Sequence, residues 1–496
     1  MTKTLDLSSF GKNDIRGIYG EGVTEELFYY TGKAFVKYIE EKTGMYPGDI
    51  WITVSRDARL HSGALAKVLI KGINHAGANT INLDIVPTPV GYYSEFASYP
   101  ETIGKNIKVS GALIVTASHN PPEYNGLKLT FNKMSLDEKE IKILKEITKE
   151  ETSSDNNAVK HGEARLYNIL PQYNDMLASR FAMIGKGLKV VVDSANGTAG
   201  VIAPKLYKDI GCEVVELYSE PDGHFPNHHP NPSDISTLKD LCEKVVQTKA
   251  DIGIAFDGDS DRLGIVDSDG NILTGDKLLY IYAQDIIKDL SVRGEVPVIV
   301  SEVKCSQVLF DEINKVGGHA VMAKTGHGYI KSKMKETNAI LAGEMSGHMF
   351  FKDRYYGFDD AVYAGCRIIE IIAKNKNNNK NFKLSDILLP FEKVCTLDEV
   401  RYKCANNLKS KVLKDITEKI NQNNKIFGTK INDIITLDGL RIIFPDGFAL
   451  IRQSNTEPVF TLRFEAADKE NALHYKNVMI SLLDESIKNF SDSEEK

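Results

Sequence analysis

Hydrophobic runs and helical stretches alternate along the first two thirds of the chain, and one order of them occurs three times. Each time, a short apolar and β-branched run is followed by a helical stretch that ends at a glycine, and then by a second apolar run. This order predicts a strand, a crossover helix and a second strand parallel to the first. The three repeats occupy residues 51–83, 189–217 and 298–321. They predict an α/β fold class, with three related α/β domains whose sheets are mixed and mostly parallel.

The last part of the chain has a different pattern. An amphipathic stretch near 408–421 predicts a helix, and two apolar runs at 440–444 and 448–451 flank a Pro-Asp-Gly sequence. Such a sequence between two apolar runs is typical of a hairpin. The alternating run 461–466 predicts another strand. We therefore expect a small C-terminal α+β domain.

A polar segment rich in lysine and asparagine, residues 374–381, precedes this last domain. Its biased composition predicts a surface loop or linker. The patterns together predict four domains, with the boundaries 1–160, 161–262, 263–385 and 386–496.

Composition narrows the class of protein. The chain has 496 residues, of which 42% are apolar and 26% charged, as in an ordinary globular protein with several cores. Its 61 basic and 68 acidic side chains give a net charge of −7, so we expect no nucleic-acid partner. No run approaches the about 18 apolar residues of a membrane-spanning helix, and the first residues lack the apolar part of a secretory signal. We expect a cytoplasmic protein with no membrane partner.

The cysteines agree with that expectation. None of the six cysteines, at 212, 242, 305, 366, 395 and 404, stands in a C-x-x-C pair. A zinc knuckle and a thioredoxin-type motif are therefore excluded. The pattern favours reduced core thiols in a cytosolic enzyme.

Ser118 lies in the first segment with candidate chemistry. The sequence TASHNPP (116–122) follows the apolar run 112–115, which predicts a buried strand that leads into a stiff loop. Ser118 is therefore either a nucleophilic or phosphorylated serine, or a turn serine that bonds the backbone. A hydrolase pair of Ser118 and His119 is disfavoured, because adjacent side chains diverge and the chain has no G-x-S-x-G motif.

Three aspartates follow the apolar run 252–256. Asp257, Asp259 and Asp261 alternate along DGDSDR, so their carboxylates can converge on one hard cation such as Mg²⁺. An EF-hand is excluded, because this loop lacks the glycine and glutamate that an EF-hand needs at its sixth and twelfth positions. The alternative is a solvated acidic turn.

Glu344, Ser346 and His348 alternate along the sequence GEMSGH (343–348). In an extended segment these three side chains point one way and offer donors and acceptors to sugar hydroxyls. The alternative is an ordinary polar loop.

The sequence RQSNTEP (452–458) combines one guanidinium with hydroxyl and amide groups. Arg452, Ser454, Asn455 and Thr456 therefore make a candidate phosphate site. The alternative is a turn capped by serine and asparagine.

Other candidates are weaker. Lys324 or His327 could lie near a phosphate, whereas the proline and asparagine around His224, His228 and His229 favour an exposed loop over a metal site. The chain contains neither the G-x-x-x-x-G-K-[ST] loop of nucleotide triphosphatases nor the G-x-G-x-x-G fingerprint of dinucleotide-binding domains.

Taken in order, these motifs resemble those of the α-D-phosphohexomutase family: a phosphoserine loop, a metal loop, a sugar loop and a phosphate loop, one from each of four domains. The resemblance extends from DIRG (14–17) to RFEA (463–466). The GEMSGH sequence and the SNT of the phosphate loop are most similar to the phosphomannomutase/phosphoglucomutase branch. Glucosamine-type members usually have glutamine at the position of Met345 and Ser-Gly-Thr in the phosphate loop.

The resemblance implies four domains around a central cleft and a role for each motif. Ser118 resembles the phosphoserine and contributes to the metal site with the three aspartates. Glu344 and Ser346, with His348 beside them, resemble the grip on the sugar 3- and 4-hydroxyls, and residues 452–456 resemble the site of the phosphate that is not transferred. The residues that match the basic residues of the family's active site are Arg16, His119, Lys128, Lys304 and His327. Asn13 stands where the branch often has tyrosine, so the resemblance does not extend to an aromatic sugar contact there.

The activity implied is reversible conversion of hexose 1-phosphate to hexose 6-phosphate, with glucose or mannose as the sugar. Mg²⁺ is the implied cofactor, and a hexose 1,6-bisphosphate the intermediate and activator. The expected partners are small-molecule sugar phosphates, and we expect no obligate protein partner. A phosphoglucosamine mutase, a Mg²⁺-dependent sugar phosphatase and a non-catalytic sugar-phosphate sensor remain as alternatives.

Overall fold

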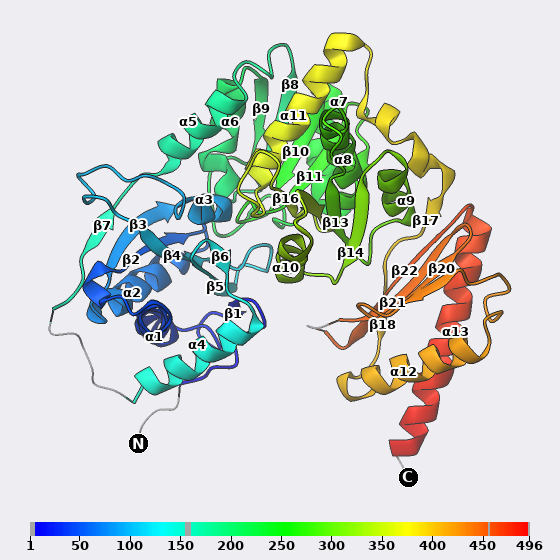
Figure 1. The fold of residues 1–496 in the computed structure, drawn as a ribbon, viewed down its shortest axis with the longest axis horizontal. Helices are drawn as coiled ribbons and strands as arrows, with labels where there is room; N and C mark the ends of the chain where they lie inside the picture. Colours follow the sequence, from blue (N-terminus) through cyan, green and yellow to red (C-terminus); the bar gives the residue numbers. More distant parts are fainter. Residues whose placement is uncertain (1–4, 154–159, 455–456, 495–496) are drawn as a thin grey trace. The chain divides into compact units, whose positions relative to one another are not determined.

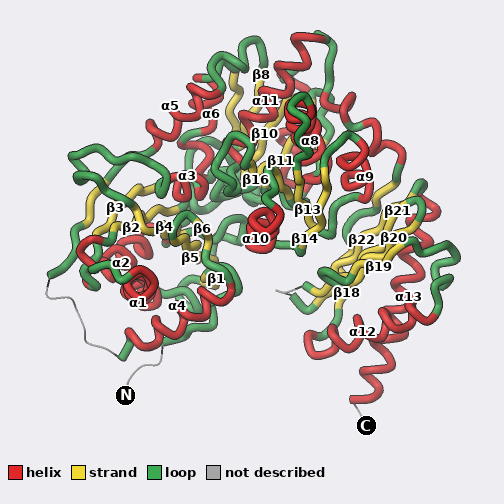
Figure 2. Tube along the Cα trace, in the orientation of Figure 1, coloured by secondary structure: helices red, strands yellow, loops and turns green. Residues whose placement is uncertain are grey.

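The computed structural model describes residues 5–153, 160–454 and 457–494 (Figure 1). The chain forms two compact units. The first consists of residues 1–274, 346–350 and 358–383, and the second of residues 275–345, 351–357 and 384–496. Within the described residues the strands form four sheets, which follow one another along the chain (Figure 2).

The first sheet has a parallel centre and an antiparallel side. Strand β2 lies between β4 and β3 and is parallel to both, whereas β5 runs antiparallel to β4 and β1. The apolar sides of α1, α2 and α4 share one core with this sheet. The strand order is β1-β5-β4-β2-β3-β7, and β6 pairs with β5. The elements are β1 (Ile15–Ile18), α1 (Glu25–Thr43), β2 (Trp51–Arg56), α2 (Ser62–His75), β3 (Asn79–Ile85), α3 (Thr88–Tyr93), β4 (Val109–Val115), β5 (Tyr124–Phe131), β6 (Met134–Ser135), α4 (Glu138–Glu151) and β7 (Ala164–Leu166).

The second sheet also belongs to the first unit. Strands β10, β8 and β9 are parallel, and β11 returns antiparallel to β10. Every residue of β10 and β11 is buried, as expected for strands covered on both faces. The strand order is β12-β11-β10-β8-β9. The elements are α5 (Leu170–Arg180), β8 (Lys189–Asp193), α6 (Ala203–Asp209), β9 (Glu213–Leu217), α7 (Lys239–Thr248), β10 (Ile252–Phe256), β11 (Leu263–Asp267), β12 (Ile272–Leu273) and, much later in the chain, α11 (Ala361–Asn378).

The third sheet is centred on β13, which is parallel to β14 on one side and to β15 on the other. Helices α8, α9 and α10 pack against its strands (Figure 1). The elements are α8 (Gly275–Ser291), β13 (Val298–Glu302), α9 (Gln307–Lys315), β14 (His319–Ala323), α10 (His327–Thr337), β15 (Leu341–Gly343) and the short following strand β16 (Met349–Phe351).

The fourth sheet is antiparallel throughout its described pairs. Strands β20 and β21 form the predicted hairpin, with Phe444 paired to Gly447 across the turn. Helices α12 and α13 pack their apolar sides into one core with the sheet. The strand order is β17-β22-β21-β20-β19, and β18 pairs with β22. The elements are β17 (Cys395–Thr396), β18 (Val400–Lys403), α12 (Asn406–Gln422), β19 (Asp433–Ile435), β20 (Leu440–Phe444), β21 (Gly447–Gln453), β22 (Val459–Ala466) and α13 (Lys469–Glu494).

The three predicted βαβ repeats are confirmed. Each pairs its two strands in parallel, β2 with β3, β8 with β9 and β13 with β14. The glycine that ends each helical stretch has a positive φ, of 96° at Gly77, 103° at Gly211 and 98° at Gly317. That left-handed conformation costs glycine little and other residues more, so the sequence fixes where each crossover turns back.

The prediction of a surface loop at residues 374–381 is wrong over most of its length. Helix α11 continues to Asn378. The helix is driven by the buried run from Ala361 to Ala373 upstream, and the polar residues simply extend it. Asn375 donates from its side chain to the carbonyl of Ile371 at 2.8 Å, and Lys376 pairs with Asp251.

Candidate active site

The loop after β4 carries Ser118 in a left-handed conformation, with φ of 52°. The hydroxyl of Thr116 accepts the backbone N–H of Ser118 at 2.9 Å. The Ser118 side chain is buried, and its hydroxyl donates to Oδ2 of Asp257 at 2.7 Å. Ser118 is thus not a turn serine whose hydroxyl is occupied by the backbone.

The Ser118 and His119 side chains do not diverge as expected from their adjacency. Oγ of Ser118 lies 3.2 Å from Nδ1 of His119, because the positive φ of Ser118 turns the chain between the two side chains. The charge of Arg262, together with burial and the charge of Arg16, holds the pKa of His119 well below its usual value. His119 is therefore a neutral hydrogen-bonding partner of Ser118 at neutral pH.

The three aspartates lie in the tight turn between β10 and β11. All three are at most 1% exposed, so the solvated acidic turn is excluded. Oδ1 of Asp257 accepts the backbone N–H groups of Asp261 and Arg262, each at 3.1 Å. One oxygen from each aspartate lies within 4.8 Å of the others. The turn therefore collects the carboxylates, as the spacing predicted.

These carboxylates fit a hard divalent cation. Burial, with the charges of Asp261 and Asp259, raises the pKa of Asp257 well above its usual value. Oδ1 of Asp259 is buried and accepts no hydrogen bond from any described residue. A buried acceptor without a partner is costly, and an oxygen-ligated cation would satisfy it. The acidic trio is therefore the candidate metal site, and Oγ of Ser118 lies beside it.

Lys128, on β5, is the nearest cation to this cluster. Its Nζ lies 2.6 Å from Oδ2 of Asp259 and also pairs with Asp261. Burial alone would raise the pKa of Asp261, but Lys128 and His348 outweigh it and lower that pKa. Thr88 adds a hydroxyl donor to Oδ2 of Asp259 at 2.6 Å. These contacts occupy Oδ2 of Asp259 and leave Oδ1 for another ligand.

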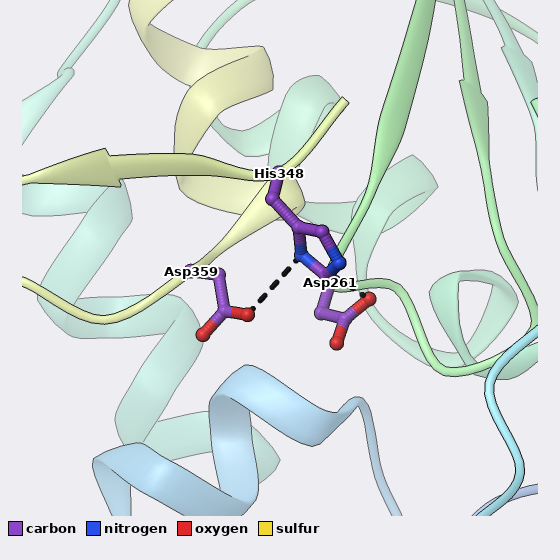
Figure 3. Close-up of side chains that lie close together, drawn as sticks. All are labelled: Asp261, His348 and Asp359. Atoms are coloured by element: carbon purple, nitrogen blue, oxygen red, sulfur yellow. Dashed lines mark ion pairs between the residues drawn. The ribbon is translucent and has the colours of Figure 1, made fainter. Parts of the chain in front are cut away.

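His348 lies beside Asp261 and Asp359 (Figure 3). Residues 344–347, which precede it, do not form the expected extended segment. The sequence turns after β15, and Gly347 has a φ of 91°. The His348 ring is 3% exposed, with Nδ1 3.1 Å from Oδ2 of Asp359 and 3.7 Å from Oδ1 of Asp261. Nε2 accepts a hydrogen bond from Nε of Arg262 at 2.9 Å. The structure thus places His348 with the serine and the aspartates.

Arg16, on β1, also belongs to this group. Its Nη1 donates to Oδ1 of Asn120 at 2.9 Å, next to the Ser118 loop, and its Nη2 to Oδ2 of Asp14 at 2.5 Å. Burial would lower the pKa of Arg16, but the charges of Asp14 and Asp259 outweigh it and raise it. A permanent positive charge therefore lies beside the serine loop.

In the second unit, Glu344 is 2% exposed and accepts the backbone N–H of Gly326 at 2.7 Å. This bond ties the sugar-loop candidate to the start of α10, whose first residue is His327. Lys304 follows β13 and has its Nζ 3.8 Å from Glu302 and 3.9 Å from Glu399. Ser346 belongs to the first unit, where its carbonyl accepts the hydroxyl of Ser233 at 3.0 Å.

Arg452 is the last residue but one of β21 and is 8% exposed. Its Nε donates to Oδ2 of Asp438 at 3.2 Å, and the same carboxylate oxygen accepts the backbone N–H of Thr325 at 3.0 Å. The Ser454 hydroxyl accepts the N–H of Glu457 at 3.1 Å. Asn455 and Thr456 lie outside the described residues.

The expectation of an exposed histidine loop is wrong for His228. His224 is exposed and pairs with Asp222, but the His228 side chain is only 14% exposed and its Nε2 lies 3.1 Å from Oδ2 of the buried Asp193. The six cysteines are unpaired thiols, of which Cys212, Cys305, Cys366 and Cys404 are buried.

Sequence reasoning missed several residues that orient the site: Asp359, Asp438 and Arg59. Asp359 could have been found, because two aspartates before the apolar stretch 361–373 indicate a helix start, and Asp360 indeed caps α11. Asp438 and Arg59 had no such signal, since their partners lie far away in the sequence.

Comparison with known proteins shows which class of enzyme has this arrangement of domains. Sequence models of all four domains of the phosphoglucomutase/phosphomannomutase family match the chain: domain I at residues 7–155, domain II at 171–270, domain III at 274–390 and the C-terminal domain at 399–481. The protein is therefore an enzyme of the phosphohexomutase class. More particularly, the chain belongs to the phosphoglucomutase/phosphomannomutase family.

Individual relatives agree over nearly the full length. The chain is 38% identical over 476 residues to a phosphomannomutase/phosphoglucomutase of Pseudomonas aeruginosa, covering 96% of this chain and 95% of that protein. It is 37% identical to a phosphoglucomutase of Neisseria gonorrhoeae, with 92% of each covered. A crystal structure of a phosphoglucomutase/phosphomannomutase family protein from Burkholderia thailandensis superposes with a TM-score of 0.85 and 35% identity, over 97% of this chain and 98% of that one.

None of the helices that the structure describes has the length and apolar character needed to pass through a bilayer.

Proposed function

We propose that the protein interconverts hexose 1-phosphate and hexose 6-phosphate, with glucose or mannose as the sugar, through a phosphoryl group carried on Ser118. The observation that carries this proposal is the contact between the Ser118 hydroxyl and Asp257, which joins the candidate nucleophile to three buried carboxylates. A serine that alternately holds and releases a phosphoryl group needs concentrated positive charge beside it. The three carboxylates can supply that charge by binding a divalent cation. Membership of the phosphoglucomutase/phosphomannomutase family supports the same assignment.

Mg²⁺ is the proposed cofactor, held by Asp257, Asp259, Asp261 and an oxygen on Ser118. When bound, it supplies positive charge that stabilises the phosphoryl group in transfer. Arg16, Lys128 and Arg262 are the side chains that we assign to the remaining charge. Arg16 bonds Asn120 of the Ser118 loop, and Lys128 bonds Asp259. Nη1 of Arg262 lies 3.5 Å from Nε2 of His119, the residue after Ser118. His119, whose ring is neutral, orients the Ser118 oxygen.

His348 is the proposed proton acceptor. In the forward step the P–O bond to Ser118 breaks and a P–O bond to the free sugar hydroxyl forms. The hydroxyl proton passes to Nε2 of His348 after Nε of Arg262 has released that nitrogen. The partner of Nδ1, Asp359, fixes the tautomer that leaves Nε2 as the basic nitrogen. The proton returns when the second phosphoryl group goes back to Ser118.

The substrate groups that do not react need their own sites. We assign the sugar hydroxyls to Glu344 and Ser346, and the phosphate that is not transferred to Arg452 and Ser454 together with Asn455 and Thr456. Lys304 and His327 supply further contacts to the substrate. A hexose 1,6-bisphosphate, formed after the first transfer, must turn end for end before the second, and added bisphosphate should activate the enzyme by phosphorylating Ser118.

The domain boundaries that we propose are those expected from the sequence, and the family matches at 7–155, 171–270, 274–390 and 399–481 support them. We also propose a cytoplasmic enzyme that acts on small-molecule sugar phosphates without an obligate protein partner. Its net charge of −7 and its unpaired thiols support this.

A coupled assay with glucose 1-phosphate, mannose 1-phosphate and glucosamine 1-phosphate tests the proposal, with release of inorganic phosphate followed in parallel. The glucose and mannose substrates should both turn over, with kcat/KM within about two orders of magnitude, or ~3 kcal/mol, and phosphate release should be negligible. Preference for glucosamine 1-phosphate would assign the chain to the phosphoglucosamine mutases. Phosphate release at the rate of sugar turnover would make it a phosphatase, and no turnover at all a non-catalytic binding protein.

A further inference from the structure

Arg59 lies directly behind the Ser118 loop and is 1% exposed. It sits in the turn between β2 and α2, and none of the motifs of the sequence contains it. Its guanidinium group contacts four backbone carbonyls of one loop.

The four terminal N–H groups of Arg59 point at four carbonyl oxygens of a single loop. Nη2 donates to the carbonyls of Ser118 at 2.9 Å and Asn120 at 2.5 Å. Nη1 donates to the carbonyls of Pro121 at 2.6 Å and Tyr124 at 3.0 Å. A planar guanidinium has a fixed fork of donors, so the loop must keep these carbonyls in one arrangement for the four bonds to coexist.

The remaining nitrogen of Arg59 is fixed from the other side. Nε lies 3.1 Å from Oδ2 of Asp57, whose Oδ1 accepts the Ser62 hydroxyl at 2.5 Å and the backbone N–H of Arg59 at 3.0 Å. The Phe225 ring covers the guanidinium, with its centroid 5.4 Å from Cζ. Gly223 packs directly on the backbone of this turn, because a Cβ there would lie 2.6–2.9 Å from backbone atoms of residues 58–60. Arg59 is thus itself held rigidly.

The consequence for Ser118 is conformational. A non-glycine residue with φ of 52° is held against its own preference, and the bond from Arg59 to its carbonyl stabilises that state. The same φ brings Oγ to Asp257 and His119. Turning loop carbonyls toward a buried cation also keeps their partial negative charge away from a phosphoryl group on Oγ.

Two other loops with candidate site residues show the same device on a smaller scale. Lys409, 6% exposed, donates to the carbonyls of Ser454 at 2.7 Å and Glu457 at 2.9 Å in the candidate phosphate loop. Arg441, 1% exposed, donates to the carbonyls of Val303 and Cys305, the two neighbours of Lys304. In each of these three loops, a buried cationic side chain therefore donates hydrogen bonds to backbone carbonyls beside a candidate binding residue.

We propose that Arg59 is a positioning residue for phosphoryl transfer, which fixes the Ser118 loop in its reactive conformation without touching the substrate. This inference rests on the proposed function of Ser118. It predicts that loss of the four-carbonyl contact slows the transfer step and leaves substrate binding nearly unchanged.

The test uses Arg59→Lys, with Arg367→Lys as the matched control. Arg367 is equally buried in the same unit but lies in α11, where it bonds the Tyr363 hydroxyl at 3.1 Å. Lysine keeps the charge in both variants and loses the planar fork. Asp57→Asn is the milder second variant if Arg59→Lys does not fold, because it weakens only the support of Nε.

Two measurements are made on the full-length proteins. Amide hydrogen exchange at Ser118, Asn120 and Tyr124 should be about tenfold faster in Arg59→Lys than in the wild type. The single-turnover rate from phosphorylated Ser118 to glucose 1-phosphate should fall about 30-fold or more, with KM within about threefold. Asp57→Asn should move both quantities in the same direction by less, and Arg367→Lys should leave both within about twofold.

Wild-type exchange and wild-type transfer rate in Arg59→Lys and Asp57→Asn would overturn the inference. Equal losses in Arg367→Lys would also overturn it, because they would show a general effect of destabilisation. If the wild-type protein transferred no phosphoryl group to any hexose phosphate, the proposed function would fall, while the exchange measurement would still decide whether Arg59 holds the loop.

Discussion

The hydroxyl of Ser118 donates a hydrogen bond to Oδ2 of Asp257 across 2.7 Å, although 139 residues separate the two in the sequence. This bond joins the loop after β4 to the turn after β10. Each of these loops follows a buried strand at the strand's carboxyl end, where parallel α/β sheets commonly place their functional groups. The nucleophile and the metal site that we propose are therefore parts of one hydrogen-bonded group.

The first prediction concerns Ser118 itself. Purified protein should carry one phosphoryl group on a peptide that contains residues 116–120. Ser118→Ala should lose at least about 10³-fold in kcat, because no other hydroxyl of the described residues is bonded to Asp257. Peptide mass spectrometry and steady-state kinetics measure both. Ser110→Ala, on the same strand, is the control and should behave as the wild type. A Ser118→Ala variant with near-normal mutase activity would refute the assignment.

The second prediction concerns the metal. Because three buried carboxylates lie together, Mg²⁺ should stabilise the folded protein, by about 2.7 kcal/mol at a free concentration 100 times Kd. Thermal unfolding with and without Mg²⁺ measures the gain, and chelation should abolish turnover. Asp259→Asn should lose most of the gain, whereas Asp269→Asn, an exposed residue paired with Lys383, should keep it. Full activity in excess chelator would contradict the prediction.

The third prediction concerns Asp359. Asp359→Asn removes the negative charge that lies 3.1 Å from Nδ1 of His348 and should favour the wrong tautomer, so kcat should fall by about 10²–10⁴ with little change in KM. Asp360→Asn is an isosteric control on the next residue. Asp360 caps α11 by accepting the N–H of Tyr363 at 2.8 Å, and asparagine caps helices equally well. Steady-state kinetics should separate the two variants clearly, and equal activities would exclude the proposed role of His348.

The fourth prediction concerns Arg452. A charge-assisted bond to phosphate contributes about 1.5–3 kcal/mol, so Arg452→Ala should raise KM by about 10–100-fold for glucose and mannose substrates alike. Its kcat should fall less than that of Ser118→Ala, and Ser118 should still be phosphorylated. Arg452→Lys should recover only part of the loss, since lysine lacks the bidentate fork. Lys414→Ala, which removes an exposed charge on α12, is the control. An Arg452→Ala variant with unchanged KM would end the phosphate-site assignment.

The fifth prediction concerns pH and His228. Burial would lower the pKa of His228, but its bond to Asp193 and the charge of that carboxylate outweigh burial and raise the pKa above 6.5. The folded state then binds more protons than the unfolded state above pH 6.5, so this contribution to stability is complete below about pH 6.5 and is lost as the pH rises through the folded pKa. The urea midpoint of the wild type should fall from about pH 6 to about pH 8 relative to that of His228→Gln. Parallel pH profiles of the two proteins would show that the pair does not contribute.

Much of this site is local in sequence, and that part could be predicted. The aspartates alternate on one short turn, and Ser118 follows a strand that its apolar run already indicates. The glycines that end the helical stretches likewise indicated where the three crossover helices stop. What could not be predicted depends on contacts between distant segments. Arg59 reaches the carbonyl of a residue 59 positions away, and nothing in a pattern of polar and apolar residues identifies a backbone acceptor.

Two errors had local causes. We expected the Ser118 and His119 side chains to diverge, because the positive φ at Ser118 carries no sequence signal when the residue is not glycine. We expected an extended GEMSGH segment, but Gly347 turns the chain and directs His348 toward Asp359. At Ser118 the conformation is imposed by buried partners against the residue's own preference, whereas at Gly347 it is one that glycine adopts readily.

The division of the chain into its two units has a consequence for biosynthesis. The first unit includes residues 346–350 and 358–383, which the ribosome makes after most of the second unit's α/β part. His348, Asp359 and α11 are thus absent when residue 274 emerges. At about 5–20 residues per second, roughly 5–20 s pass between the synthesis of residue 274 and that of residue 383. During that interval the surface that α11 will cover in the first unit is exposed to water. A chaperone that shields this surface would therefore act on the protein at that stage of translation.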